Sequence, residues 1–561
     1  MLTMLSLLIV SPAMAENNPP NAVISNAIIA DIPPDGFESI VDLLPSLIPL
    51  DFPVEDQYLE DGLGWGCVVD VWFNLTNVDV SAVVTDAHII PQDGYLDFSV
   101  TLSLAINDAA NLFGMDYELV CVEYNCDAYV DPFDVVISSQ IYLNVADIDN
   151  DGLNELDAYF ENFGFDFSDF DGNDVNIQNC ALGTFEDVLG FFGWSIFDLI
   201  IGAIGPGLEE GVADAIPDIE AAIEEAFAQA TISETIDIGG ASLDLSIAPS
   251  DIIIKPEGLR LILDGSATTS EASSCISTFD PMGSKSTASI LMPIGYTPAS
   301  ISRPDIAATI DDDFMNQLLY SAWRGGLLCI TVDEDTFALD TSMLDLLTGN
   351  AFTDLFPEPQ PMIIKTMPEN PPTLNLDTNS DIAIDIEDLG LNFFAIVDGR
   401  RTRLLNVALT TDVGVDIPFD ASTGEINVAI DLDTDRVTPN VIYNEFRPDV
   451  SSTIESSFAG QLDTILSLVD LDSMLGDLQF AFPSVSGFGL NDLSMEATGQ
   501  NDEDLGAFAG IGPVPYENAG CGDSGDTSGC GGGCSTNGKP NSRLALLSFV
   551  ALFGWLRRRS S

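Results

Sequence analysis

The most specific chemical pattern in the chain is a short acidic loop, DIDNDGLNE, at residues 147–155. Its spacing places oxygen ligands at alternate positions, and its glycine allows the sharp turn that a calcium loop needs. The glutamate that an EF-hand carries at its twelfth position is missing, because Ala158 stands there. The loop therefore predicts a Ca²⁺ site, with a solvated acidic turn as the alternative. Its ligands would be Asp147, Asp149, Asp151 and Glu155.

The residues that most enzyme chemistry requires are scarce. His88 is the only histidine, which argues against multi-histidine metal sites and against catalysis by Ser-His-Asp or Cys-His groups. Neither the G-x-S-x-G nor the H-E-x-x-H pattern occurs. We therefore expect no enzymatic activity, and we interpret His88 as a surface or packing residue.

Charge limits the partners of the chain. Sixteen Lys and Arg stand against 90 Asp and Glu, which gives a formal net charge of −74, and the first cation in the sequence is Lys255. Nucleic-acid binding is excluded, because it needs clustered cations. Such charge often accompanies disorder, but 32 Phe, 5 Trp and a mean hydropathy of +0.23 indicate packed cores.

Both ends carry features of processing signals. Residues 1–15 combine an apolar run with Ala13 and Ala15, the small residues of a signal-peptidase site. Residues 501–541 form a Gly/Cys/Ser-rich spacer, and residues 542–561 hold a short apolar segment followed by an arginine cluster. That order is typical of a spacer, a hydrophobic stretch and a cationic stop. We therefore expect export and display at the surface of a bacterial cell, anchored in the outer membrane.

The C-terminal tail resembles the MYXO-CTERM sorting tails of bacteria, in which a Cys-containing motif precedes a short helix and an Arg cluster. The resemblance implies that processing and anchoring occur at Cys530 or Cys534. The Gly-Cys spacing is looser than in the compact family motif, and a plain membrane anchor is the alternative.

Cysteine usage agrees with export. Three of the nine cysteines lie in the tail, and the even number left in the body suggests disulfides. The pairs that we consider are Cys121 with Cys126, Cys67 with Cys180, and Cys275 with Cys329. The sequence leaves the connectivity open.

Hydrophobic periodicity divides the body into two similar halves. Residues 96–106 alternate between apolar and polar types without error, as expected of a half-buried antiparallel strand. Residues 238–247, 252–263, 405–417 and 426–432 alternate in the same way. Long amphipathic helices are expected at residues 185–227 and 450–474, and shorter ones at 306–323 and 343–355.

These patterns predict an α+β fold with two tandem units of long antiparallel strands, each packed on a long helix. The first unit spans residues 20–265 and the second spans residues 305–500. A Ser/Thr/Pro-rich linker, residues 266–304, joins them.

Residues 236–265, IDIGGASLDLSIAPSDIIIKPEGLRLILDG, are similar to the N-terminal barrel of the bactericidal permeability-increasing and lipopolysaccharide-binding proteins, in the TULIP superfamily. In that family a strand, an "AP" turn and a glycine-introduced strand follow the barrel helix. Residues 70–106 resemble the paired early strands of the family. The resemblance implies two tandem elongated antiparallel β-barrels, each wrapped on a long amphipathic helix in a boomerang-like arrangement.

The resemblance further implies apolar channels that hold phospholipid or another acyl lipid. The expected lining residues are Phe191, Phe192, Ile196, Leu199, Ile200, Ile219, Ile223 and Phe227. The rival function is a calcium-stabilised structural or adhesion protein at the cell surface, whose barrels are filled by their own side chains. Nothing in the sequence identifies a protein partner.

The sequence departs from the best-known members of this family in its charge. Because the first half has no cation before Lys255, it lacks the Arg and Lys groups that hold phosphates. We therefore expect neutral or zwitterionic lipid rather than endotoxin. Arg400, Arg401 and Arg403 belong either to a solvated β-turn or to a contact with an anionic partner.

Overall fold

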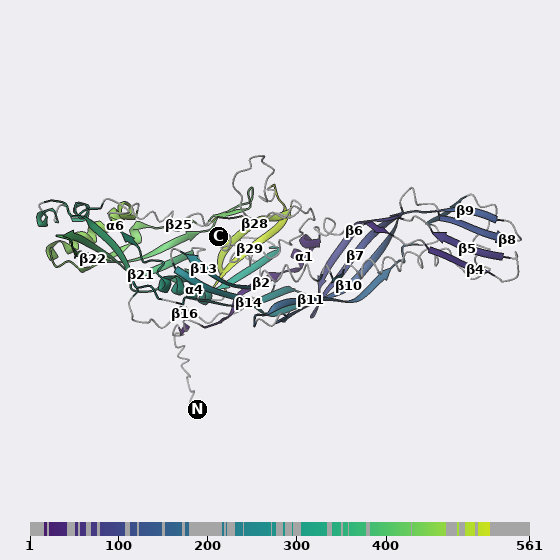
Figure 1. Ribbon diagram of the computed structural model, residues 1–561, viewed down its shortest axis with the longest axis horizontal. Helices are drawn as coiled ribbons and strands as arrows, with labels where there is room; N and C mark the ends of the chain where they lie inside the picture. Colours follow the sequence, from purple (N-terminus) through teal and green to yellow (C-terminus); the bar gives the residue numbers. More distant parts are fainter. Residues whose placement is uncertain are drawn as a thin grey trace, which may run out of the picture.

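A computed structural model gives the architecture. It describes residues 16–18, 22–41, 51–53, 57–62, 69–75, 79–106, 113–119, 123–148, 152–170, 174–178, 231–238, 241–270, 272–276, 284–286, 304–333, 339–348, 352–356, 358–376, 382–427, 429–466, 479–481, 488–499 and 503–515, with residues 216, 217, 220 and 294. The molecule is elongated and built mainly of long antiparallel strands (Figure 1).

The centre of the molecule is a seven-stranded sheet that combines strands from distant parts of the chain (Figure 1). Its order is β13 (Ile232–Ile238), β14 (Ala241–Lys255), β15 (Gly258–Thr268), β2 (Ile24–Ile32), β17 (Ile306–Asp311), β29 (Asp504–Pro513) and β28 (Phe488–Thr498). The sheet therefore joins the two predicted halves by backbone hydrogen bonds, and β29 lies in the segment that the sequence assigned to the spacer.

Two five-stranded sheets extend from the centre toward one end (Figure 1). The nearer one has the order β11 (Glu155–Asp166), β10 (Phe133–Ala146), β7 (Leu96–Ile106), β6 (Asp79–Pro91) and β3 (Asp51–Pro53). The outer one has the order β12 (Val175–Gln178), β9 (Glu123–Val130), β8 (Phe113–Leu119), β5 (Val69–Leu75) and β4 (Gln57–Gly62).

The opposite end holds a second large sheet and its helices (Figure 1). Its order is β18 (Thr331–Val332), β19 (Met362–Pro368), β21 (Ile382–Val397), β22 (Arg400–Asp416) and β25 (Ala429–Asp431), with β20 (Thr373–Leu376) beside β21 and β26 (Thr438–Tyr443) beside β22. The helices are α5 (Met343–Thr348) and α6 (Ser451–Leu466). Smaller elements are α1 (Pro34–Val41), β1 (Glu16–Asn18) paired with β16 (Ser284–Ser286), and the sheet of β23 (Phe419–Asp420), β24 (Glu425–Asn427) and β27 (Gln479–Ala481).

Helix α4 (Asp312–Gly325) connects the central sheet to the second large sheet. Its Gln317 side chain accepts a hydrogen bond from the Ala267 N–H at 2.8 Å, and Asn316 accepts one from the Leu374 N–H at 2.7 Å. Phe314 packs closely against Gly265, where a Cβ would lie 2.8 Å from the ring. The glycine near the end of the family-like segment is therefore needed for helix packing.

Strand predictions from alternation are confirmed. Residues 96–106 form β7, and Leu96, Val100, Leu102 and Leu104 are buried. The two segments around residue 250 form the hairpin of β14 and β15. The expected turn at the "AP" pair is absent, because Ala248 and Pro249 lie inside β14. The chain turns instead between Lys255 and Gly258. A register shift directly after Pro249 accommodates the proline, as bulges commonly do.

The helix predicted at residues 306–323 begins six residues later than expected. Residues Ile306–Asp311 form β17, which pairs with β2 and β29. Asp311 then caps the helix by accepting a hydrogen bond from the N–H of Asp313. The apolar spacing of Ile306 and Ile310 fits a helix as well as a strand, and only the two neighbouring strands decide between them.

The remaining helix predictions have mixed outcomes. The C-terminal helix at residues 450–474 corresponds to α6. The stretch 185–227 lies outside the described residues, apart from residues 216, 217 and 220. Within the part of the chain that the structure describes, strand far outweighs helix, and no helix there is long and apolar enough to cross a membrane.

Candidate lipid-binding face and acidic sites

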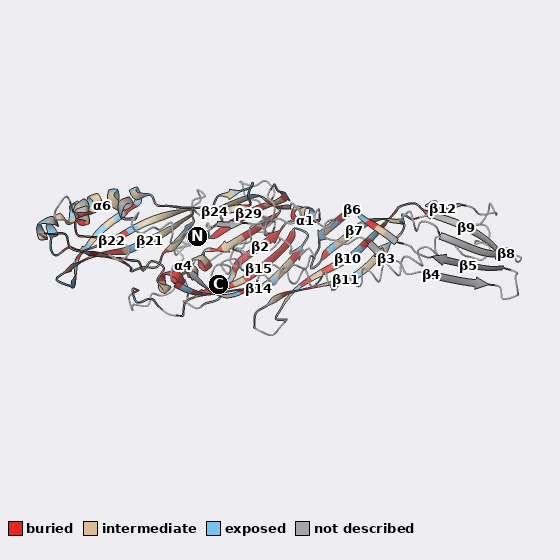
Figure 2. Cartoon of the chain, turned by 45° about the horizontal axis from the view of Figure 1, so that its top comes forward, coloured by how far each residue is buried: buried red, intermediate tan, exposed pale blue. Residues whose placement is uncertain are grey.

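The main apolar cluster lies between the central sheet and the sheet of β6, β7, β10 and β11. Alternation along each strand places every second side chain on this face. Leu245 and Ile247 of β14 and Leu261 of β15 belong to the same buried cluster as Leu143 of β10 and Leu156 of β11. Buried residues accordingly form stripes along these strands (Figure 2). Two sheets thus present their apolar faces to one shared interior.

Register shifts give these strands the means to curve. They occur between Val84 and Asp86 of β6, Ser138 and Gln140 of β10, and Pro249 and Asp251 of β14. A bulge bends its strand and increases the local twist. An apolar sheet face that is bent in this way suits the enclosure of an elongated apolar ligand or of a core of side chains.

Several apolar side chains on this face are only partly buried, which makes them the described positions best suited to meet an apolar ligand. They are Ala30, Ile89, Phe98, Phe160, Ile252, Ile310 and Leu318. The Phe160 N–H donates a hydrogen bond to Glu220 at 3.1 Å. Glu220 belongs to the stretch 185–227, so this stretch lies beside β11 at that point. The eight predicted lining residues themselves, from Phe191 to Phe227, lie outside the described residues.

The second large sheet packs its apolar face against helices. Phe393 of β21, Leu405 and Val407 of β22, and Ile454 and Phe458 of α6 are fully buried in one cluster. In this half the predicted packing of a helix on long strands is present. These side chains pack together between α6 and the sheet.

A charged pair crosses the central sheet between β2 and β15. Arg260 donates from Nε to Asp31 at 2.7 Å and from a second nitrogen at 2.5 Å. Both residues are buried. Burial raises the pKa of Asp31, and the hydrogen bond and charge of Arg260 oppose that shift. The bidentate geometry compensates a carboxylate whose side chain is only 10% exposed.

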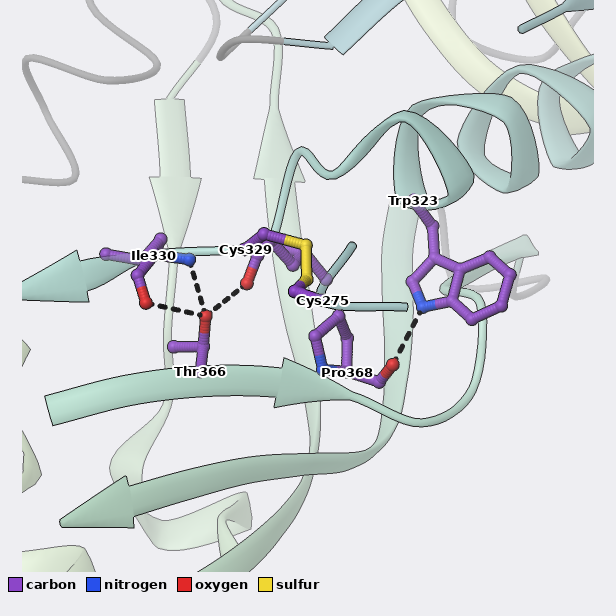
Figure 3. The surroundings of a disulfide bond; sticks show 7 residues. Cys275, Trp323, Cys329, Ile330, Thr366 and Pro368 are labelled. Carbon is purple, nitrogen blue, oxygen red and sulfur yellow. Dashed lines mark hydrogen bonds between the residues drawn. A yellow bond between two sulfur atoms is a disulfide. The ribbon is translucent and has the colours of Figure 1, made fainter. Parts of the chain in front are cut away.

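The predicted disulfide between Cys275 and Cys329 is present (Figure 3). It lies at the C-terminal end of α4, where Ile276 packs with Tyr320 and Trp323. The Trp323 indole donates to the Pro368 carbonyl at 3.2 Å, and the Thr366 hydroxyl accepts from the Ile330 N–H at 2.6 Å (Figure 3). The disulfide end of the predicted linker is thus fixed to α4. Cys67, Cys121 and Cys180 lie outside the described residues, and Cys126 is placed only as a backbone position in β9.

The predicted calcium loop forms the turn between β10 and β11. Glu155 is the first residue of β11 and pairs with Ala146. Asp147 accepts a hydrogen bond from the Gly152 N–H at 3.3 Å, and Gly152 has a φ of 93°. Asp149 and Asp151 lie outside the described residues. The turn that the glycine predicts is present, and the Ca²⁺ site stays a prediction.

A second acidic site, which the sequence analysis missed, lies where β17 meets α4. The carboxylate oxygens of Asp311, Asp312 and Asp313 lie within 4.8 Å of one another. Glu503 and Asp504 arrive from the other end of the chain, because Asp504 pairs with Asp311. Burial, together with the charges of Asp311, Glu503 and Asp312, raises the pKa of Asp504 to about 7. The runs DDD and DED were visible in the sequence, but nothing there showed that they meet or that they are buried.

His88 and the arginines at the start of β22 lie on the surface. His88 is exposed, with its Nε2 3.1 Å from Asp86, in agreement with the prediction. Arg401 and Arg403 lie over the Phe394 ring, at 5.0 and 5.6 Å from its centroid. Arg400 is exposed at the start of β22. The three arginines therefore surround an exposed hairpin and its aromatic neighbour, a geometry compatible with cation–π contacts.

No protein-family model matches the sequence, and no curated protein matches it. Among solved structures, the crystal structure of lipopolysaccharide binding protein aligns with a TM-score of 0.50 and 14% identity, over 87% of this chain and 99% of that chain. P47 from Clostridium botulinum A2 aligns with a TM-score of 0.25 and 10% identity, over 87% of this chain and 98% of that chain. P47 of Clostridium botulinum E1 aligns with a TM-score of 0.26 and 9% identity, over 88% of this chain and 100% of that chain.

At these identities only the first likeness carries an argument, and it concerns the fold. The chain shares the overall fold of lipopolysaccharide binding protein along nearly the whole length of that protein. This likeness supports the overall fold that the resemblance in residues 236–265 implies, while the two tandem barrels and the long helix of the first barrel stay predictions. The resemblance of the C-terminal tail concerns residues that the structure does not describe.

Proposed function

We propose that this protein is an exported lipid-binding protein that shields acyl chains against the apolar face between the central sheet and β6, β7, β10 and β11. The observation that carries the proposal is the set of partly buried apolar side chains on that face, in a fold shared with lipopolysaccharide binding protein. Burial of about 25 cal/mol per Å² of apolar surface supplies the binding energy. In this proposal the chain forms two tandem barrels, and the stretch 185–227 covers the first one.

The cargo class follows from charge. Binding of phosphorylated lipid by electrostatic attraction requires Arg and Lys groups at the site. The strands of these two sheets carry two described cations: Arg260 is buried and paired with Asp31, and Lys255 is exposed at the end of β14. We therefore propose a neutral or zwitterionic phospholipid as cargo, rather than an anionic endotoxin.

Cell-surface display and transfer of lipid between membranes complete the proposal. They are supported by the signal-like residues 1–15, the cysteines Cys530 and Cys534, and the arginine cluster at the C-terminus. The protein is proposed to act without catalysis and without nucleic acid, because the sequence offers neither a nucleophile–base pair nor a basic surface of the required size.

The direct test is native mass spectrometry of the purified chain, followed by organic extraction. We expect one or two lipids per chain. Ile89 and Ile90 provide matched variants, because they are neighbours on β6, Ile89 packs against the apolar cluster and Ile90 is 53% exposed. Ile89→Trp should reduce bound lipid and Ile90→Trp should not, with both proteins unfolding at similar temperatures. Equal lipid content in the two variants would contradict the proposed face.

The second candidate is a calcium-stabilised surface structural or adhesion protein. It is favoured by the second large sheet, where Ile454 and Phe458 of α6 are fully buried against Phe393 and fill the space as an ordinary core. A chain that carries no extractable lipid and takes up no fluorescent phospholipid, but unfolds at a higher temperature with Ca²⁺, would support this function instead.

A further inference from the structure

The second large sheet carries two facing asparagines on the face that is turned away from α6. Phe393 of β21 and Leu405 of β22 are direct cross-strand partners, and both pack in the apolar cluster with α6. Asn392 and Asn406 are the neighbouring pair on the same two strands. Because successive side chains of a strand point to opposite faces, the two asparagines lie on the face opposite the apolar cluster.

Both asparagines have buried amide atoms without a hydrogen-bond partner. Asn392 is 1% exposed, and neither its Nδ2 nor its Oδ1 is paired. The Oδ1 of Asn406 is also buried and unpaired. It lies 3.6 Å from the position that a Cβ would take on Gly390, so the Asn406 side chain reaches across to β21 beside Asn392. Buried polar groups without a partner lower stability, and two facing ones indicate a hydrogen-bonding ligand.

The guanidinium of Arg403 lies next to this pair. Arg403 is the cross-strand partner of Phe394, which follows Asn392 by two residues and shares its face. The Arg403 Cζ lies 5.6 Å from the centroid of the Phe394 ring and 5.8 Å from that of Tyr443, the cross-strand partner of Asn406. Cation–π contacts with both rings hold the guanidinium there. Arg403 is therefore positioned between the neighbours of the two asparagines.

The cations of this face lack an acidic partner, although the chain has 90 Asp and Glu. Lys365 of β19 is half-buried and is the cross-strand partner of Asn392, and Arg403 is exposed. Within the part of the chain that the structure describes, no ion pair joins either of them to a carboxylate, whereas the exposed Arg436 pairs with Asp412. The face therefore offers uncompensated positive charge to an external anion.

Two further charged side chains flank this group. The Arg401 Cζ lies 5.0 Å from the centroid of the Phe394 ring. The Glu445 carboxylate accepts a hydrogen bond from the Tyr443 hydroxyl at 3.5 Å. Their opposite charges offset each other, so the two unpaired cations set the sign of the site.

We propose that Lys365, Asn392, Asn406 and Arg403 bind a phosphate ester that carries free hydroxyl groups, of which glycerol phosphate is a simple example. The cations require an anion, and a phosphoryl group has enough oxygens for donors from three strands, whereas a carboxylate has two. The unpaired asparagine oxygens accept hydrogen bonds and need donors, which the hydroxyl groups of such an ester supply. Free glycerol phosphate and the head group of phosphatidylglycerol share this chemistry.

The proposed site does not rest on the proposed lipid-binding face. That face lies between the central sheet and β6, β7, β10 and β11, whereas these residues belong to β19, β21 and β22. With a lipid head group as ligand, the site would dock this end of the molecule on an anionic membrane.

The test is calorimetric titration of the full chain with glycerol phosphate at constant ionic strength. We expect one site per chain. Arg403→Gln removes the guanidinium, and Asn392→Leu removes both unpaired amide atoms with little change in volume; each should weaken binding by about tenfold. Arg436→Gln is the matched control, because it removes an exposed arginine that is already paired with Asp412. It should leave binding unchanged.

A second arm distinguishes the two sources of the phosphate ester. It measures flotation of the chain with phosphatidylcholine vesicles that contain or lack phosphatidylglycerol. Binding to the phosphatidylglycerol vesicles that Arg403→Gln reduces would identify a lipid head group. Equal flotation of the two proteins, with the calorimetric difference retained, would identify a free phosphate ester.

Three results would overturn the proposal. They are a wild-type chain that binds neither probe, unchanged affinity in Arg403→Gln or Asn392→Leu, and equal weakening in Arg436→Gln, which would reduce the effect to unspecific charge. If Asn392→Leu fails to fold, Arg403→Gln decides, because its side chain is exposed. Ile89→Trp should reduce extracted lipid without changing the affinity for glycerol phosphate, so failure of this site is distinguishable from failure of the lipid-binding face.

Discussion

Two acidic regions of this protein contain similar residues in opposite surroundings. The turn at residues 147–155 lies on the surface, where Asp147 is exposed and Glu155 half-buried. The site formed by Asp311, Asp313 and Asp504 is buried. Water compensates charge in the first region, whereas only the protein, protons or a cation can do so in the second. The same side chain can therefore be neutral to stability in one place and costly in another.

The two regions also differ in how their ligands are linked. The ligands of the surface turn lie within nine consecutive residues, so an unfolded chain keeps them close together. The carboxylates of the buried site come from β17, α4 and β29 and meet only after folding. The surface turn can therefore form locally, whereas the buried cluster depends on the tertiary structure.

The largest predicted loss of stability follows from removing Arg260, the partner of the buried carboxylate of Asp31. Arg260→Met leaves Asp31 buried beside an apolar side chain, and breaking a buried pair in this way costs about 3–5 kcal/mol. We expect a clearly lower thermal unfolding temperature. The double variant Asp31→Asn/Arg260→Met should recover much of the loss. A single variant as stable as the wild type would show that this fold tolerates an uncompensated buried acid, and would weaken the contrast drawn above.

The next effect concerns the other end of α4, which the disulfide fixes. Replacing Cys275 and Cys329 with Ser releases a crosslink across a sequence separation of 54 residues and should cost roughly 2–4 kcal/mol. Thermal unfolding with and without reductant measures it. Reductant should lower the unfolding temperature of the wild type and leave that of the variant unchanged. An equal effect of reductant on both proteins would mean that the disulfide does not stabilise this end of the helix.

The comparison of the two acidic regions is tested by their separate Ca²⁺ responses. At about 100 times its dissociation constant, an ion that binds only the folded state adds about 2.7 kcal/mol. Because the predicted calcium loop is the surface turn, the calcium-induced rise in unfolding temperature should largely disappear in Asp149→Ala and survive in Asp504→Asn. Scanning fluorimetry in Ca²⁺ and in chelator provides the measurement. The reverse order would assign the stabilising ion to the buried acidic site.

The smallest effect concerns the backbone of the surface turn. Gly152 has a φ of 93° and open space around its Cα. Gly152→Ala should therefore cost only about 1 kcal/mol, through backbone strain rather than through a clash. Gly399→Ala, in another open hairpin turn with a φ of 73°, is the matched control. A loss much greater for Gly152 than for Gly399 would indicate that the turn is more tightly organised than its exposure suggests.

Local patterns were sufficient for much of the fold. Alternation over residues 96–106 predicts a strand with one buried face because a period of two is intrinsic to extended backbone. The same reasoning failed at Ile306–Asp311, where a six-residue apolar segment was assigned to a helix. Its strand conformation depends on hydrogen bonds to β2 and β29, which are far away in the sequence.

Sequence by itself determined the acidic character of this protein, the faces of its long strands and the turn at Gly152, because these depend on composition and on neighbouring residues. Tertiary structure alone decided that Asp31 pairs with Arg260, that Asp504 lies beside Asp311, and that both of these aspartates are buried. The physical reason is that burial and charge compensation arise from long-range packing. An aspartate in a solvated turn and one in a buried cluster are the same letter in the sequence.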